Sequence, residues 1–145
     1  MTFRTAVLGA GMIWLGAIVG QPRVDAQEQK TVWDGVYSEE QAKRGQAAYE
    51  ADCASCHQAD FAGDGFAPSL AGPEFASAWN DLSVGDLYDR IRQSMPPTDP
   101  SAVQPATKVD IVAYLLKGNK MPAGTTELPK EVDGLKQIKY LANKP

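Results

Sequence analysis

The stretch Glu50–Asp60, EADCASCHQAD, holds both cysteines of the chain, Cys53 and Cys56, and its only histidine, His57. Cysteine and histidine are common ligands of transition metals and common attachment points for cofactors. Their use at this one place raises the question of what the three side chains bind. The fold depends on the answer, because the rest of the chain has to surround whatever they hold.

Four interpretations of this Cys-x-x-Cys-His pattern compete. A disulfide between Cys53 and Cys56 would close a very short loop and gain little chain entropy. A redox dithiol of the thioredoxin kind normally follows a strand in a βαβ unit, and no strand pattern precedes Cys53. A structural zinc site would need a further cysteine or histidine, which the chain does not have. Covalent haem attachment accounts for all three residues, because two thiols can add to the porphyrin vinyl groups and His57 can ligate the iron. We therefore predict one haem c at Cys53, Cys56 and His57.

The sixth ligand of the iron is expected to be a methionine, because the chain has no second histidine. Outside the N-terminal segment only Met95 and Met121 remain. Met95, in RQSMPPTDP, lies between two predicted helices, where a rigid proline loop can hold it over the ring. Met121, in GNKMPAG, follows the strongest predicted helix, where the chain should be leaving the core. We favour Met95, and either methionine could instead fill a gap in the core.

Residues 1–26 have the layout of a secretory signal peptide. Arg4 supplies a basic start, Ala6–Gly20 is an uncharged and largely apolar run, and a small-residue cleavage pattern ends at Ala26. The apolar run is short for a membrane span, and an uncleaved N-terminal anchor is the alternative. We expect cleavage after Ala26, export to the periplasm, and one domain over residues 27–145 without a transmembrane segment.

The charge balance is mildly acidic. The chain has 14 Lys and Arg against 18 Asp and Glu, a net charge of −4, and removal of the predicted signal peptide makes it more negative. This argues against a nucleic-acid partner, which would need a basic face. It permits docking to a protein with a basic patch, because complementary charge steers encounters, although an acidic surface also simply favours solubility.

The remaining sequence predicts helices and loops and no sheet. The first helix begins after Ser38, which has the capping-box spacing to Gln41, and Gly45 within it indicates close approach by another element. Apolar residues at helical spacing mark the clearest helix, the one before Gly118. The predicted helices are Ser38–Cys53, Pro73–Asp81, Ser83–Ser94 and Thr107–Gly118, with a possible short helix around Val132–Leu141. The fold class is therefore all-α.

Long loops rich in glycine, proline and aspartate separate these helices. Gln58–Pro73 is one of them. Asp60 and Asp64 lie among glycines there, but the run lacks the terminal glutamate of an EF-hand loop, so it indicates turns rather than a calcium site. Long ordered loops in so small a domain need something to lie against, and a haem would supply it.

The chain closely resembles the class I c-type cytochromes, in particular the small bacterial ones that accompany quinoprotein or other periplasmic dehydrogenases. The resemblance spans about Trp33 to Leu128 and rests on CASCH after an N-terminal helix, on PSLAG, on SMPP and on DIVAYLLKGN. It implies the cytochrome c fold, in which N- and C-terminal helices cross and long loops wrap one covalent haem.

The same resemblance implies roles for individual residues. Cys53 and Cys56 would form thioethers, His57 would be the proximal ligand, and Met95 would be the distal ligand. The carbonyl of Pro68 would accept the other histidine N–H, a contact that orients the ring and tunes the metal.

The resemblance also implies contacts away from the ligands. Gly45 and Tyr49 would meet Tyr114 where the two helices cross. Trp79 could hydrogen-bond a haem propionate or simply belong to the core. The interval from His57 is shorter to Met95 than in the mitochondrial type, which is the argument for the alternative, Met121.

The expected function is periplasmic electron transfer by a monohaem carrier that is not an enzyme. A periplasmic dehydrogenase would be the donor, and an oxidase or another cytochrome the acceptor. An exposed haem edge, with Ala62, Phe66 and Ala67 nearby, would be the contact site. The alternatives are a haem sensor or peroxidase-like protein with an open distal position, and a dedicated subunit of one dehydrogenase.

Overall fold

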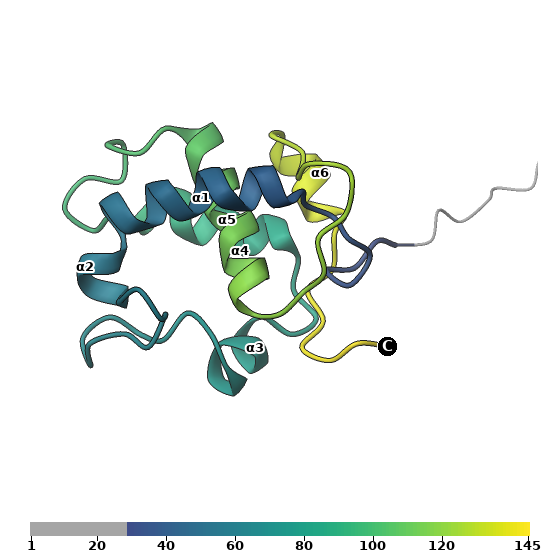
Figure 1. Ribbon diagram of the computed structural model, residues 1–145, viewed down its shortest axis with the longest axis horizontal. Coiled ribbons are helices and arrows are strands. Elements are labelled where there is room, and N and C mark those ends of the chain that lie inside the picture. The colour runs from purple at the N-terminus through teal and green to yellow at the C-terminus, as the bar shows by residue number, and fades with distance from the viewer. Residues whose placement is uncertain (1–28) are drawn as a thin grey trace, which may run out of the picture.

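The computed structural model describes residues 29–145, so the predicted signal peptide lies outside the described residues. Within this range the chain forms helices, loops and isolated bridges but no strand, which confirms the all-α prediction (Figure 1). No helix in this part of the chain is long and apolar enough to cross a membrane. The helices are α1 (Glu39–Asp52), α2 (Ala54–His57), α3 (Pro73–Trp79), α4 (Val84–Ser94), α5 (Pro105–Gly118) and α6 (Val132–Lys136).

Helices α1 and α5 cross in close contact, as the resemblance implies (Figure 1). Gly45 makes the approach possible, because a Cβ at this position would overlap the backbone carbonyl of Asp110 and come within 3.0 Å of the amide nitrogen of Ile111. One turn further along α1, the rings of Tyr49 and Tyr114 pack edge to face with centroids 5.4 Å apart. The crossing therefore fixes the orientation of α1 and with it the position of Cys53, which directly follows this helix.

The buried side chains form two clusters. The larger one joins α3, α4, α5 and α6 to the segment before α1 and includes the fully buried Val112, Leu116 and Tyr140. The smaller one lies next to the Cys-x-x-Cys-His motif and is called here the motif-side cluster: Tyr49, Phe61, Val103, Ile111 and Leu115. The packed structure thus continues to Tyr140, beyond Leu128, where the resemblance ends.

Serine caps begin α1 and α4, but the capping-box partner predicted for Ser38 makes a different contact. Ser38 caps α1 by accepting from the amide of Gln41, as predicted, but the Gln41 side chain accepts from the amide of Leu128 instead of completing a capping box. Ser83 and Asp86 form a full capping box on α4. The long-range bond of Gln41 therefore anchors a distant loop rather than its own helix.

Three predicted boundaries are wrong. Helix α3 ends at Trp79 rather than Asp81, because Asn80 leaves the helical conformation with φ −57 and ψ 135. Helix α5 starts at Pro105 rather than Thr107, because proline has no N–H to lose and is well suited to the first helical turn. Helix α6 ends at Lys136, and the chain leaves the helix so that Tyr140 can donate its amide to the carbonyl of Leu82. At the end of α6 a backbone contact decides the boundary, and the side-chain pattern does not report it.

Candidate haem site

Cys53 is the junction between two helices. It ends α1, where its amide donates to the carbonyl of Tyr49, and it is the N-cap of α2, which consists of the rest of the motif. Cys53 is half-buried, Cys56 is exposed, and both thiols are free of any disulfide. The motif is therefore a separate helical turn with two available thiols three residues apart.

The environment of Cys53 does not suit a redox dithiol. Burial raises the pKa of its thiol to about 11, and the charge of Asp52 adds to the effect. Reactive cysteines in oxidoreductases have lowered pKa values, because the thiolate is the nucleophile. The alternative of a thioredoxin-like site thus lacks its chemical basis here.

His57 is held by one hydrogen bond from its ring. The side chain is 8% exposed, and its Nδ1 lies 2.9 Å from the carbonyl oxygen of Pro68. A carbonyl can only accept, so Nδ1 carries a proton, and in the neutral imidazole this tautomer leaves the lone pair on Nε2. This is the contact that the resemblance implies for Pro68, and it prepares Nε2 to ligate a metal.

The loop after the motif turns back to bring Pro68 to His57. The amide of Gly63 donates to the carbonyl of His57 at 3.0 Å, and Gly63 has φ +75 with no room for a Cβ beside the carbonyl of Ala67. The carboxylate of Asp64 accepts from the amides of Phe66 and Ala67 at 2.9 and 2.7 Å. These bonds lower the pKa of Asp64 and close the turn.

The aspartates of this loop therefore act as turn residues, as predicted. Asp60 accepts from the amide of Ala62 at 3.1 Å in a similar local turn. Across residues 29–145 no three His, Cys, Asp or Glu side chains converge in a way that could hold a metal ion by themselves.

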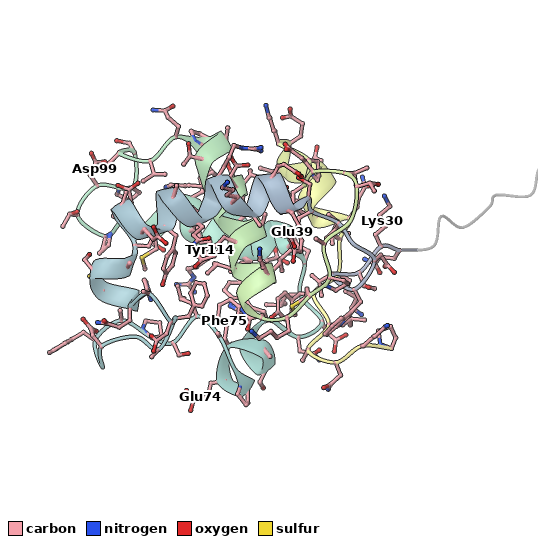
Figure 2. The ribbon with its side chains drawn as sticks, in the orientation of Figure 1. Lys30, Glu39, Glu74, Phe75, Asp99 and Tyr114 are labelled. Atoms are coloured by element: carbon pink, nitrogen blue, oxygen red, sulfur yellow. The ribbon has the colours of Figure 1, made fainter. Side chains whose placement is uncertain are left out.

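The donor set does fit haem. Two free thiols three residues apart and an imidazole directly after them are the groups that covalent attachment uses. Around them, Phe61 packs on Tyr49 and Tyr114 with ring centroids 5.0 and 5.1 Å away (Figure 2 labels Tyr114). The Tyr49 hydroxyl donates to the carbonyl of Gln58 at 2.7 Å, so the aromatic group locks the loop after the motif to both crossing helices.

Sequence reasoning missed Phe61. It lies in a loop with φ +66, outside any helical pattern, and only the three-dimensional packing reveals it. Its ring also lies against Gly118 at the end of α5. A phenylalanine in a glycine-rich loop was the available signal, and it does not separate Phe61 from the fully exposed Phe66 in the same loop.

The two candidate methionines lie in different surroundings. Met95 is the C-cap of α4, half-buried, and opens the proline loop that leads to α5. Met121 is 4% exposed and belongs to the larger core cluster, where its carbonyl accepts from the Tyr37 hydroxyl at 2.7 Å. Met121 thus has the contacts of a core residue, and Met95 is half-buried at the start of a loop.

Trp79 packs against Phe75 with ring centroids 6.1 Å apart, and both belong to or border the larger core cluster. Phe66 is fully exposed.

Lys108 of α5, which sequence reasoning also missed, is buried at 2% exposure, and burial lowers its pKa. A lysine at the start of a helix normally predicts a solvated side chain, so no sequence pattern reveals it.

Comparison with known proteins adds to this geometry. The model of the family described as cytochrome c oxidase, cbb3-type, subunit III matches residues 40–115. The fructose dehydrogenase cytochrome subunit of Gluconobacter japonicus is 38% identical over 109 residues, which cover 66% of this chain and 22% of that protein. The chain therefore spans about a fifth of the length of this relative. No solved structure matches this chain.

Proposed function

The chain belongs to the family of the cytochrome c oxidase cbb3-type subunit III, a family of c-type cytochrome domains, and on that premise we propose that it is a periplasmic single-electron carrier with one haem ligated by His57 and Met95. Covalently bound haem c and an electron-transfer role follow from the family. The single haem, the axial pair, the export and the absence of an enzymatic reaction are the proposal.

The His57–Pro68 hydrogen bond is the observation that carries the proposal. It fixes the ring orientation and the protonated nitrogen, and so presents Nε2 for ligation. Cys53 and Cys56 would hold the porphyrin by thioethers on the same helical turn. When bound, the haem iron supplies the one-electron chemistry between Fe(II) and Fe(III). The protein residues fix the ligands, exclude water and offer a docking face.

Met95 is supported as the distal ligand by what surrounds the two methionines. Met121 is part of the larger core cluster, where an unbranched apolar side chain fills space. Met95 is half-buried at the end of α4 and is followed by two prolines that restrict the loop. A methionine ligand opposite histidine would also raise the reduction potential, as a carrier that accepts electrons from a dehydrogenase needs.

The proposed partners are redox proteins. The relative from Gluconobacter is named as the cytochrome subunit of a dehydrogenase, so we propose a periplasmic dehydrogenase as donor and an oxidase or another cytochrome as acceptor. The fully exposed Phe66 beside Pro68, with Asp60 and Asp64 in the same loop, offers an apolar contact within an acidic surround. Such a face suits a partner with a basic rim.

Optical spectra of the exported protein test the axial pair. Leucine at either methionine keeps the side-chain volume but cannot ligate iron, so Met95→Leu and Met121→Leu form a matched pair. We expect the weak far-red band that marks an iron–methionine bond in ferric c-type cytochromes in the wild type and in Met121→Leu, and its loss in Met95→Leu. Loss in Met121→Leu alone would refute the Met95 assignment. A wild type without the band that binds carbon monoxide readily would instead favour the sensor or peroxidase-like alternative.

A further inference from the structure

Lys108 is a buried cation whose partners are backbone carbonyls. Its side chain is 2% exposed, and within residues 29–145 its Nζ takes part in none of the ion pairs with carboxylates. Lysine is seldom fully buried, because its long side chain usually lets the ammonium reach water. A buried ammonium therefore needs hydrogen-bond partners in the protein.

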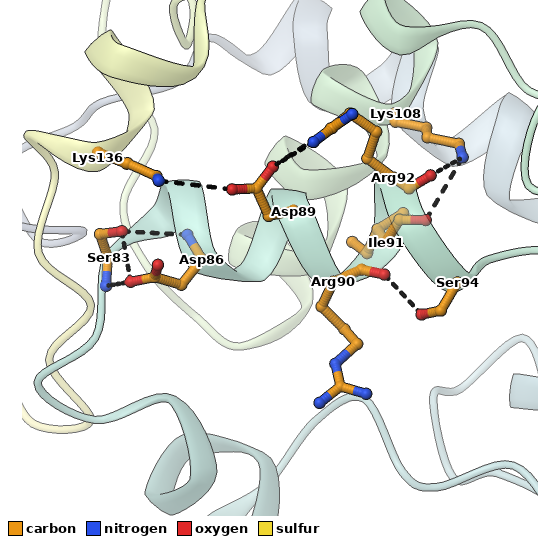
Figure 3. A network of polar contacts seen from close by, with 9 residues as sticks. All are labelled: Ser83, Asp86, Asp89, Arg90, Ile91, Arg92, Ser94, Lys108 and Lys136. Carbon is orange, nitrogen blue, oxygen red and sulfur yellow. Dashed lines mark hydrogen bonds and ion pairs between the residues drawn. The ribbon is translucent and has the colours of Figure 1, made fainter.

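Four carbonyl oxygens supply those partners. The Nζ lies 2.7 Å from the oxygen of Met95 and 2.6 Å from that of Pro100, and 3.4 and 3.3 Å from those of Ile91 and Arg92. Figure 3 shows the two contacts with the last turn of α4. An ammonium has three protons, so the two short bonds are the principal ones and the two long ones share the third.

The bonds join three parts of the molecule. Ile91 and Arg92 belong to the C-terminal turn of α4, the end of a helix whose dipole favours a positive charge. Met95 opens the proline loop between α4 and α5, and Pro100 lies in the middle of that loop. Lys108 itself belongs to the first turns of α5. One side chain thus fastens the end of a helix, and the first residue and the middle of a loop, to the next helix.

The other contacts of the loop lie in its second half. Val103 packs in the motif-side cluster, and the amide of Ala102 donates to the carbonyl of Asp99 at 3.2 Å. Asp99 also accepts from the amide and hydroxyl of Ser101. In the first half, Pro96, Pro97 and Pro100 have no N–H to donate. The Met95 amide donates to the carbonyl of Ile91 and continues α4. The carbonyl of Met95 is therefore fixed to α5 through Lys108.

We infer that Lys108 is a positioning residue for the distal ligand: its ammonium fixes the backbone of Met95 to α5 and so keeps the methionine side chain available to the iron. The inference rests on the proposed function, in which Met95 is that ligand. It follows the second-shell principle for metal sites, in which groups that hold a ligand affect the site nearly as strongly as the ligand itself.

Lys108→Met tests the inference, because methionine keeps a long unbranched side chain and removes the ammonium. Lys117→Met is the matched control, since Lys117 lies on the same helix, is exposed and, among residues 29–145, forms an ion pair with Glu39 alone. The probe is imidazole, which competes with a methionine for ferric iron. We expect Lys108→Met to bind imidazole about tenfold or more tightly than the wild type and to lose intensity in the far-red band, because two buried carbonyls lose their donor. The control should stay within about twofold. A Lys108→Met protein that also stays within about twofold would refute the positioning role.

A measurement on the wild type keeps the inference testable if Lys108→Met does not fold. Nitrogen-15 NMR of the lysine ammonium groups in the ferrous protein should show protons of Lys108 that exchange slowly with water, whereas those of Lys117 exchange rapidly. Equally rapid exchange at Lys108 would refute the inference. A wild type that lacks the far-red band would remove the proposed methionine ligation itself, and this inference with it, so the two failures are distinguishable.

Discussion

Replacing Gly45 by alanine should destabilise the protein, although alanine is the better helix former. In an exposed helix the substitution would stabilise by about 1 kcal/mol. At Gly45 the new Cβ would overlap the carbonyl group of Asp110 and lie 3.0 Å from the nitrogen of Ile111, both backbone atoms of α5. Backbone cannot rotate away as a side chain can, so the two helices have to separate.

The magnitude follows from the two opposing terms. Overpacking a well-packed contact costs about 1–3 kcal/mol, and a contact with backbone belongs at the upper end of that range. Subtracting the gain in helix propensity leaves a net loss of about 2 kcal/mol. For a domain of this size that corresponds to a fall in melting temperature of roughly 5–10 °C.

Denaturant unfolding of the haem-loaded protein, followed by circular dichroism, measures the difference. Ala47→Gly is the control, because Ala47 is exposed on the same helix and reports helix propensity alone, at a cost of about 1 kcal/mol. If Gly45→Ala is as stable as the wild type, or gains the free energy of unfolding that the control loses, then the close crossing of α1 and α5 does not require glycine at position 45.

Two further predictions concern the loops and pH. Gly63→Ala should cost about 1–3 kcal/mol and loosen the turn that returns Pro68 to His57, because Gly63 has φ +75 and no space beside the carbonyl of Ala67; an unchanged melting temperature would contradict this. Hydrogen bonds from Ser83 lower the pKa of Asp86 below its ordinary 3.8, so its contribution to stability is complete above that pH and is lost as the pH falls through the lower folded value. The stability advantage of the wild type over Asp86→Asn should therefore shrink below about pH 4, and an advantage constant from neutral pH to pH 3 would show that the capping box does not titrate.

Much of the fold could be predicted because its signals are local. Ser38 and Ser83 mark the starts of α1 and α4, because their side chains cap neighbouring amides. The apolar positions of α5 repeat at helical spacing. The start of α5 at Pro105 also has a local signal, proline at the first helical position, which the search for a side-chain cap does not use. The bond from Leu128 to Gln41 could not be predicted, because it depends on a contact that sequence spacing does not encode.

The candidate site divides in the same way. Cys53, Cys56 and His57 lie within five consecutive residues, and covalent haem attachment accounts for all three. Phe61 and Lys108 leave no such pattern: one is an aromatic in a loop that holds a second, exposed phenylalanine, and the other is a lysine where solvent exposure is the ordinary expectation. Both become significant only when helices distant in sequence are placed together.

Helix α5 contacts both α1 at Gly45 and the backbone of Met95, and this leads to a last prediction. Asp110, which meets Gly45, lies two residues from Lys108, which holds the Met95 carbonyl. Displacing α5 at the crossing should therefore also disturb the Lys108 bonds, so Gly45→Ala should raise imidazole affinity as well as lower stability. Because both substitutions would act through the same contact, the effect of Lys108→Met should be smaller in the Gly45→Ala background than in the wild type. Independent, additive effects on imidazole binding would show instead that the helix crossing and the distal loop are not coupled through α5.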